Sequence, residues 1–166
     1  MYSRILVALD GSPTAWGALD AALQLAHVTG AQLQPLYVID MPVLAYDVPG
    51  FDPSIVRDAY VAEGRIVSAD AQARLTREGV QGAPCTVEVE LGVEDIAQCI
   101  ERAAADWHAD LIVMGTHGRR GVQRLVLGSV AERVLRNAHR PVLLVPARAA
   151  VPEAKTLDEH PASAPA

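Results

Sequence analysis

This chain of 166 residues has no long apolar run and no excess of positive charge, and it contains only two cysteines. Its longest apolar stretches, such as 5–9 and 111–114, fall far short of the roughly 20 residues that cross a bilayer. The N-terminal stretch is also shorter than the about 7–15 apolar residues of a signal peptide. Fourteen Lys and Arg against twenty Asp and Glu leave a formal net charge of −6. We therefore expect neither a membrane protein nor a general nucleic-acid binder.

Two cysteines, Cys85 and Cys99, are too few for a disulfide framework and lack the spacing of a zinc site. We interpret both as small buried residues. An apolar fraction of 51% with 20% charged residues is typical of a globular protein. We predict a cytoplasmic protein with one domain over residues 1–147. Residues 148–166 are rich in Ala, Pro and polar residues without periodicity, which predicts a disordered tail.

Short β-rich runs alternate with longer helical patterns along the chain. This alternation predicts an α/β fold, in which an open, five-stranded parallel sheet carries helices on both faces. The expected strands are 5–9, 32–39, 86–91, 110–115 and 141–146, with an irregular connection over 40–53, and the expected helices are 12–30, 54–79, 93–107 and 129–138.

The third expected strand decides between two strand orders. Its apolar and polar residues alternate, and Glu88 and Glu90 face away from the core, which suits a sheet edge. This favours the doubly wound order 3-2-1-4-5 over 2-1-3-4-5. The favoured order places the first and fourth strands side by side at the point where the strand order reverses. Ligands bind beyond the carboxyl ends of the strands at such a point, where Asp10 and Gly115 stand.

Helical periodicity also predicts which helix faces are buried. Apolar residues that recur every three or four positions form one stripe, and that stripe packs on the sheet. The expected stripe of the second helix is Ile55, Ala59, Ala62, Ile66 and Ala69, and that of the third is Val93, Ile96, Ile100, Ala103 and Trp107.

The connection that follows the fourth strand, residues 116–128, exceeds the about 2–6 residues of an ordinary strand-to-helix loop. Its glycines Gly118 and Gly128 let backbone N–H groups approach phosphate oxygens. Gly128 and Ser129 also open a helix, whose first N–H groups are unpaired and favour an anion. The loop contains Arg119, Arg120 and Arg124 as additional cations. It therefore predicts an anion site, although neither a Walker A motif nor a Gly-x-Gly-x-x-Gly fingerprint occurs in the chain.

Each residue of this region also has a simpler interpretation. Ser129 to Glu132 has the pattern of a capping box, in which Ser129 caps its own helix and Glu132 reaches back. Taken alone this interpretation is preferred, but a cap hydroxyl can also turn to a phosphate. His117 alone is typical of a surface loop, Asp10 of a turn, and Met114 of the core unless a flat ring lies over it.

Together, however, the loop glycines resemble a known family. The spacing Gly-x2-Gly-x9-Gly-Ser, at Gly115, Gly118, Gly128 and Ser129, is similar to the ATP-binding signature of the universal stress proteins. The segments 5–12, 36–40 and 140–146 also resemble that family, so the resemblance spans nearly all of residues 2–146.

The resemblance implies a nucleotide site. Asp10 would accept hydrogen bonds from the ribose or the base, and the backbone of Val38 would meet the base edge. Ala8 stands where many family members have a proline, which leaves a backbone role for it. The phosphates would lie on the loop and carry a divalent cation, Mg or Mn. The predicted nucleotide-binding residues are Ala8, Asp10, Val38, Met114, Gly115, His117, Gly118, Gly128, Ser129 and Val130.

Two functions are compatible with such a site. The first is an ATP-binding regulatory or stress-response protein that changes its conformation or its protein partner with nucleotide. The alternative is a slow ATPase or phosphotransferase, which needs metal carboxylates and a residue that orients the nucleophile. Asp10, Asp40 and His117 are the candidates, and their spacing does not make them a catalytic set. We favour the binding protein and assign no catalytic residue and no protein ligand to a metal. An electron-transfer flavoprotein relative would share the fold, but no feature favours flavin.

The last expected strand predicts a homodimer. Residues Val142 to Val145 are apolar on both faces, yet the favoured order puts them at a sheet edge, where an apolar strand invites pairing with another chain. The resemblance agrees, since related proteins commonly pair through this strand.

Overall fold

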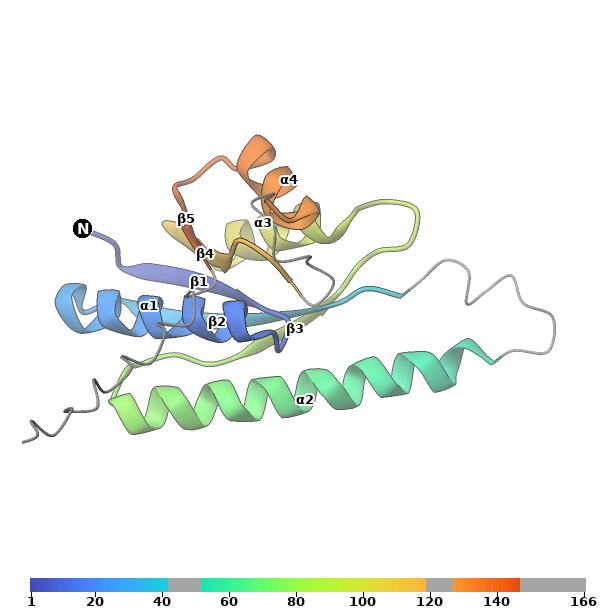
Figure 1. Cartoon of the computed structure of the whole chain (residues 1–166), viewed down its shortest axis with the longest axis horizontal. Coiled ribbons are helices and arrows are strands. Elements are labelled where there is room, and N and C mark those ends of the chain that lie inside the picture. The colour runs from blue at the N-terminus through green and yellow to red at the C-terminus, as the bar shows by residue number, and fades with distance from the viewer. Residues whose placement is uncertain (42–51, 119–126, 147–166) are drawn as a thin grey trace, which may run out of the picture.

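The computed structural model describes residues 1–41, 52–118 and 127–146. Its five strands form one parallel sheet in the order β3-β2-β1-β4-β5, which confirms the predicted topology (Figure 1). The elements are β1 (Arg4–Leu9), α1 (Pro13–Thr29), β2 (Gln32–Ile39), α2 (Pro53–Glu78), β3 (Cys85–Glu88), α3 (Ile96–Asp106), β4 (Leu111–Gly115), α4 (Ser129–Asn137) and β5 (Val142–Val145).

Several of the predicted features fall on residues outside these ranges. The tail expected at 148–166, the loop cations Arg119, Arg120 and Arg124, and most of the connection over 40–53 lie outside the described residues. Within the described ranges, no helix combines the length and the apolar character that a membrane span requires.

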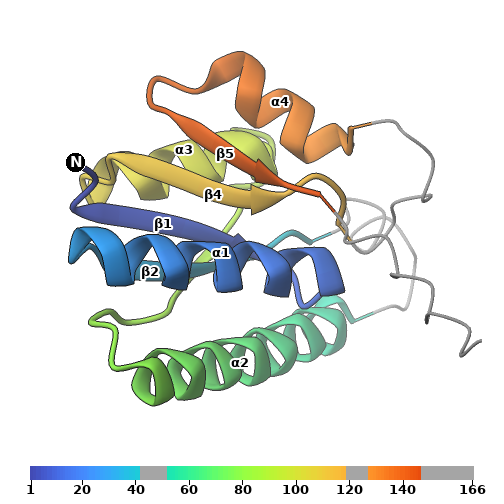
Figure 2. The ribbon, with the colours of Figure 1, turned by 60° about the vertical axis from the view of Figure 1, so that its left-hand side comes forward.

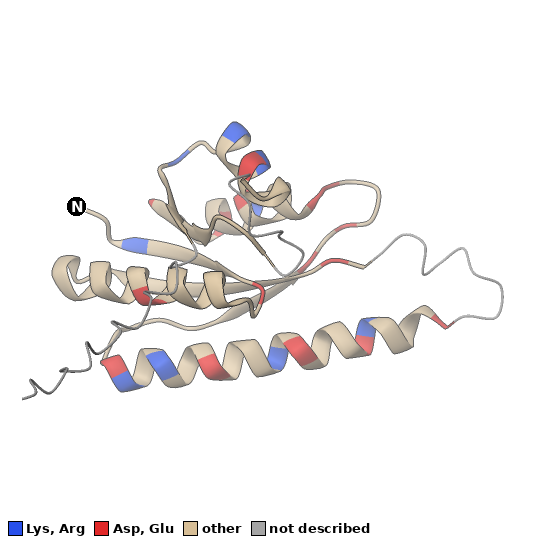
Figure 3. Cartoon of the chain, in the orientation of Figure 1, with Lys and Arg blue, Asp and Glu red and all other residues tan. Residues whose placement is uncertain are grey.

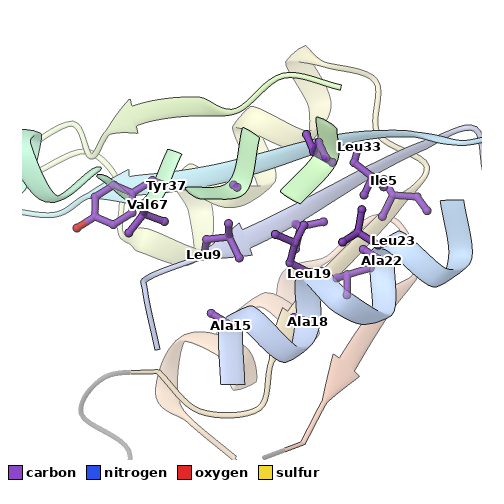
Figure 4. Close-up of a cluster of buried hydrophobic side chains, with 14 of the residues drawn as sticks. Ile5, Leu9, Ala15, Ala18, Leu19, Ala22, Leu23, Leu33, Tyr37 and Val67 are labelled. Carbon is purple, nitrogen blue, oxygen red and sulfur yellow. The ribbon is translucent and has the colours of Figure 1, made fainter. Parts of the chain in front are cut away.

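The two faces of the sheet carry different helices. Figure 2 shows α1 and α2 on one side and α3 and α4 on the other. Because side chains alternate along a strand, Ile5 and Val7 of β1 pack in the layer with α1, whereas Leu6 packs in the layer with α3 and α4. Leu19 and Leu23 of α1 fill the first layer against β1 (Figure 4). The central strands are therefore buried from both sides.

Helix α2 exists as predicted, but the predicted buried stripe is wrong. Val67, Ala71 and Leu75 are buried, whereas the side chains of Ile55 and Ile66 are 67% and 64% exposed. The whole expected stripe, Ile55, Ala59, Ala62, Ile66 and Ala69, is exposed.

The glycine of α2 explains which stripe is buried. A Cβ atom at Gly64 would lie 2.8 Å from Cδ1 of Tyr37, so the helix meets β2 along its glycine-containing face. This close approach turns the ring of Tyr37 toward Val67 (Figure 4). It also leaves the other face, where charges of both signs alternate along the helix, toward solvent (Figure 3).

The boundaries of β3 and α3 also differ from the expected ones. The backbone N of Val89 donates to O of Ile39, the last residue of β2. Beyond this bond β2 offers no further residue with which the third strand could pair toward residue 91. Helix α3 starts only after Asp95, whose Oδ1 accepts from the backbone N of Gln98 at 3.0 Å in a capping box. Val93 therefore lies before the helix and is 73% exposed, which corrects its placement in the buried stripe.

Substitutions on the two faces of α2 test this assignment. Leu75→Ala should lower the free energy of unfolding by about 2–5 kcal/mol, because a fully buried side chain leaves a cavity. Ile66→Ala, the matched control on the exposed face, should change it by less than about 0.5 kcal/mol. Urea unfolding measures both values. Equal losses from the two variants would contradict the observed packing.

Candidate functional site

A cavity of about 720 Å³ lies beyond the carboxyl ends of β1, β2 and β4. It occupies the topological switch point, because β1 pairs with β2 on one side and β4 on the other, and this is where doubly wound sheets bind ligands. All of the predicted nucleotide-binding residues lie in its wall, namely Ala8, Asp10, Val38, Met114, Gly115, His117, Gly118, Gly128, Ser129 and Val130. Their contact with a nucleotide stays a prediction.

Asp10 connects β1 to the loop. Its Oδ1 accepts from the backbone N of Ser12 at 3.0 Å, so the carboxylate is fixed at the start of α1 as a turn residue would be. Its Oδ2 would lie only 2.6 Å from a Cβ atom at Gly118. The glycine at position 118 thus allows the loop to lie against the carboxylate, and a larger residue would displace it.

Gly115 and Gly128 also allow neighbouring segments of the chain to lie close together. A Cβ atom at Gly115 would lie 3.0 Å from Cγ2 of Thr14 in the first turn of α1. One at Gly128 would lie 3.0 Å from the carbonyl O of Thr116, which accepts from the N of Gly128 at 2.8 Å. Gly128 has φ −62° and ψ 146°, which any residue adopts. Its small size, and not its torsion angles, is therefore what this site uses.

The start of α4 corrects the predicted capping box. The N-cap residue is Gly128, no side chain of the described residues caps the helix, and Ser129 is already its first residue. Glu132 does not reach back but pairs with Arg136 at 2.7 Å. The hydrogen bond from Gly128 to Thr116 holds residue 128 in the extended conformation of an N-cap, which moves Ser129 one position into the helix. The first N–H groups of α4 thus lack a side-chain cap where the helix borders the cavity, an arrangement that suits an anion.

Taken alone, His117 is typical of an exposed surface loop, but its position in the structure differs from this interpretation. It is half-buried in the cavity wall, and its Nδ1 lies 3.0 Å from Oγ1 of Thr116. Its buried Nε2 has no hydrogen-bond partner among the residues that the structure describes. Leaving a buried polar atom unpaired costs free energy, so Nε2 is a group that a polar ligand in this cavity would satisfy.

Part of the cavity wall was not predicted from the sequence. Tyr60, Thr116 and Arg133 also line the cavity, and Asp40 lies there although it was considered only for phosphoryl transfer. One signal could have identified Arg133. It follows Ser129 by one helical turn, so both residues lie on the same side of α4.

Neither cysteine contributes to this wall. Cys99 is buried and Cys85 half-buried, and both are free thiols. Burial raises the pKa of Cys99 to about 12, so it stays protonated and unreactive at neutral pH. Among the residues that the structure describes, no group of three or more His, Cys, Asp or Glu could hold a metal ion.

The fold and the site together define a doubly wound α/β protein with a glycine-lined cavity at its switch point. The family model of the universal stress protein family matches residues 1–146. The chain belongs to the universal stress protein family.

Individual relatives agree with this assignment. A crystal structure of a universal stress family protein from Burkholderia pseudomallei is 56% identical, covers 88% of this chain and 97% of its own, and superposes with a TM-score of 0.74. A universal stress protein of Methanocaldococcus jannaschii is 31% identical over an alignment of 153 residues, and the match covers 87% of this chain and 82% of that protein. A 23% identical protein from Archaeoglobus fulgidus, solved in complex with dAMP, covers 87% of this chain and 98% of its own with a TM-score of 0.64, which shows a shared fold.

Proposed function

We propose that this universal stress protein binds ATP with a divalent cation and acts as a regulatory protein, in which nucleotide occupancy changes its conformation or its choice of partner. The observation that carries the proposal is the cavity at the switch point. The groups that line it include the glycines of the motif, Gly115, Gly118 and Gly128. They also include the start of α4, which has no side-chain cap, and Nε2 of His117, which has no hydrogen-bond partner among the described residues. Each of these features suits a polar, anionic ligand.

The two ends of the cavity suit the two ends of a nucleotide. Ala8, Val38 and Met114 provide apolar surface and strand backbone for adenine and ribose. Gly128 to Val130 provide the helix N-terminus for the phosphates, whose oxygens would carry the cation. The dAMP complex of the Archaeoglobus fulgidus protein supports the proposal in one respect, because a protein of the same fold holds an adenine nucleotide.

A valine at position 128 tests the loop. Gly128→Val should abolish detectable ATP binding, because its side chain would push the start of α4 away from the Thr116 carbonyl. Isothermal titration calorimetry with ATP and Mg²⁺ measures the loss, and circular dichroism checks the fold. Gly17→Ala is the control, since a Cβ atom at Gly17 would meet only Cγ1 of Val145, at 3.9 Å. Unchanged ATP affinity in folded Gly128→Val would contradict the role of the loop.

Hydrolysis by this site should be slow or absent. Backbone N–H groups bind the phosphates of the ground state and of the transition state alike, and such uniform binding does not accelerate the chemical step. His117 is the nearest candidate to orient a water molecule, but its Nδ1 is already engaged with Thr116. We expect phosphate release far below the about 1–100 s⁻¹ of kinases, with little change in His117→Ala. Release in that range, lost in His117→Ala with ATP affinity retained, would instead favour the slow ATPase or phosphotransferase.

The proposal includes a homodimer through β5. This strand lies at the sheet edge, and Leu143 is 37% exposed there, whereas Leu144 packs inward against the α3 and α4 layer. Leu143→Lys should therefore shift the protein toward monomer, because a charge on the edge strand opposes pairing. Ile66→Lys, at another exposed isoleucine on α2, is the control and should leave the dimer intact. Light scattering measures the mass, and a monomeric wild-type protein would end this part of the proposal.

A further inference from the structure

Arg133 differs in charge from the other side chains around it. Among the described residues of the cavity wall it is the one permanent cation, while Asp10 and Asp40 are carboxylates. Asp10 and Asp40 would repel an anionic ligand in this cavity, whereas the N-terminus of α4 would attract it. The cavity therefore needs positive charge if it is to prefer an anion, and Arg133 is placed to supply it.

Two hydrogen bonds hold this guanidinium beside the start of α4. Its Nη1 donates to Oδ2 of Asp95 at 2.9 Å, and its Nε donates to the carbonyl O of Ser129 at 3.2 Å. The other oxygen of Asp95 caps α3. The Arg133 side chain is 47% exposed and lines the cavity, and its guanidinium has further N–H donors beyond these two bonds.

We propose that Arg133 is a specificity residue that makes the cavity prefer the more highly phosphorylated adenine nucleotides, by donating to a phosphate oxygen beside Ser129 and Val130. This inference rests on the proposed nucleotide binding and adds to it the residue that reads the phosphate chain. Arg133 follows Ser129 by one helical turn, and its guanidinium bonds the Ser129 carbonyl, so the guanidinium and the first N–H groups of α4 can both face one polyphosphate. Planar guanidinium groups suit phosphate oxygens, with which they form paired, charge-assisted hydrogen bonds.

Asp95 has two opposite effects in this arrangement. It orients Arg133, but its negative charge also competes with a phosphate for the same donors. Removing the charge of Arg133 should therefore weaken binding of a polyphosphate, whereas removing the charge of Asp95 should strengthen it. If the ion pair served only to join α3 to α4, loss of either partner would loosen the cavity and weaken binding in both cases.

Affinities for MgATP and for adenosine, measured by isothermal titration calorimetry, separate these outcomes. Arg133→Gln should weaken ATP about tenfold, the size of a hydrogen bond between charged groups, and change adenosine by less than about twofold. Asp95→Asn should tighten ATP a few-fold, because asparagine retains the N-cap of α3 while the competing charge is gone. Arg133→Lys keeps the charge and should restore part of the ATP affinity.

Arg136→Gln is the matched control. Arg136 lies on the same helix, is 73% exposed and pairs with Glu132 outside the cavity wall, so its loss should leave both affinities unchanged. Melting temperatures show whether each variant is folded. Equal changes of ATP and adenosine affinity in Arg133→Gln, or weaker ATP binding in Asp95→Asn, would overturn the role of Arg133 while nucleotide binding stands. A wild-type protein that binds neither ligand would overturn the proposed function and this inference with it.

Discussion

The site depends on one backbone hydrogen bond, from N of Gly128 to O of Thr116 at 2.8 Å. It joins the two ends of the loop, so the start of α4 lies against the end of β4. The N of Thr116 in turn donates to O of Val145 at 2.9 Å, which extends the connection to the end of β5. Because a Cβ atom at position 128 would lie 3.0 Å from the Thr116 carbonyl O, a larger residue would crowd this bond, which favours a glycine. The same bond leaves the helix without a side-chain cap, so the constraint that closes the loop also keeps the first N–H groups of α4 open to an anion.

This constraint connects the site to the sheet edge. Strand β5 both accepts from the loop through the carbonyl of Val145 and offers its other edge for the proposed dimer. One turn along α4 from Ser129, Arg133 connects to the N-cap of α3 through Asp95. The start of α4 is thus tied to three elements by a few polar contacts. A phosphate that shifted this helix start by a small amount would act on α3 and on β5 together, which gives the proposed regulation a physical route.

The sequence predicted the strand order and the switch point because these depend on simple patterns. Alternation in one strand identified the edge, and glycines with a helix start identified the loop. The buried face of α2 could not be predicted in the same way, since its sequence carries two apolar stripes. One stripe contains Ile55 and Ile66, but the face that meets β2 is the one where Gly64 approaches Tyr37, a contact between residues distant in the sequence. The periodicity of a sequence does not report contacts between distant residues.

The start of α4 was misjudged for a related reason. Ser129 and Glu132 have the spacing of a capping box, and only a hydrogen bond across the loop places Gly128 at the N-cap instead. A shift of one residue changes the chemistry. It turns a serine that would cap its own helix into the first residue of a helix whose start has no side-chain cap among the described residues. Local rules describe each segment by itself, whereas this cavity results from the meeting of β1, β4 and α4. The residues that local rules assigned to caps and turns are therefore the ones that form the site.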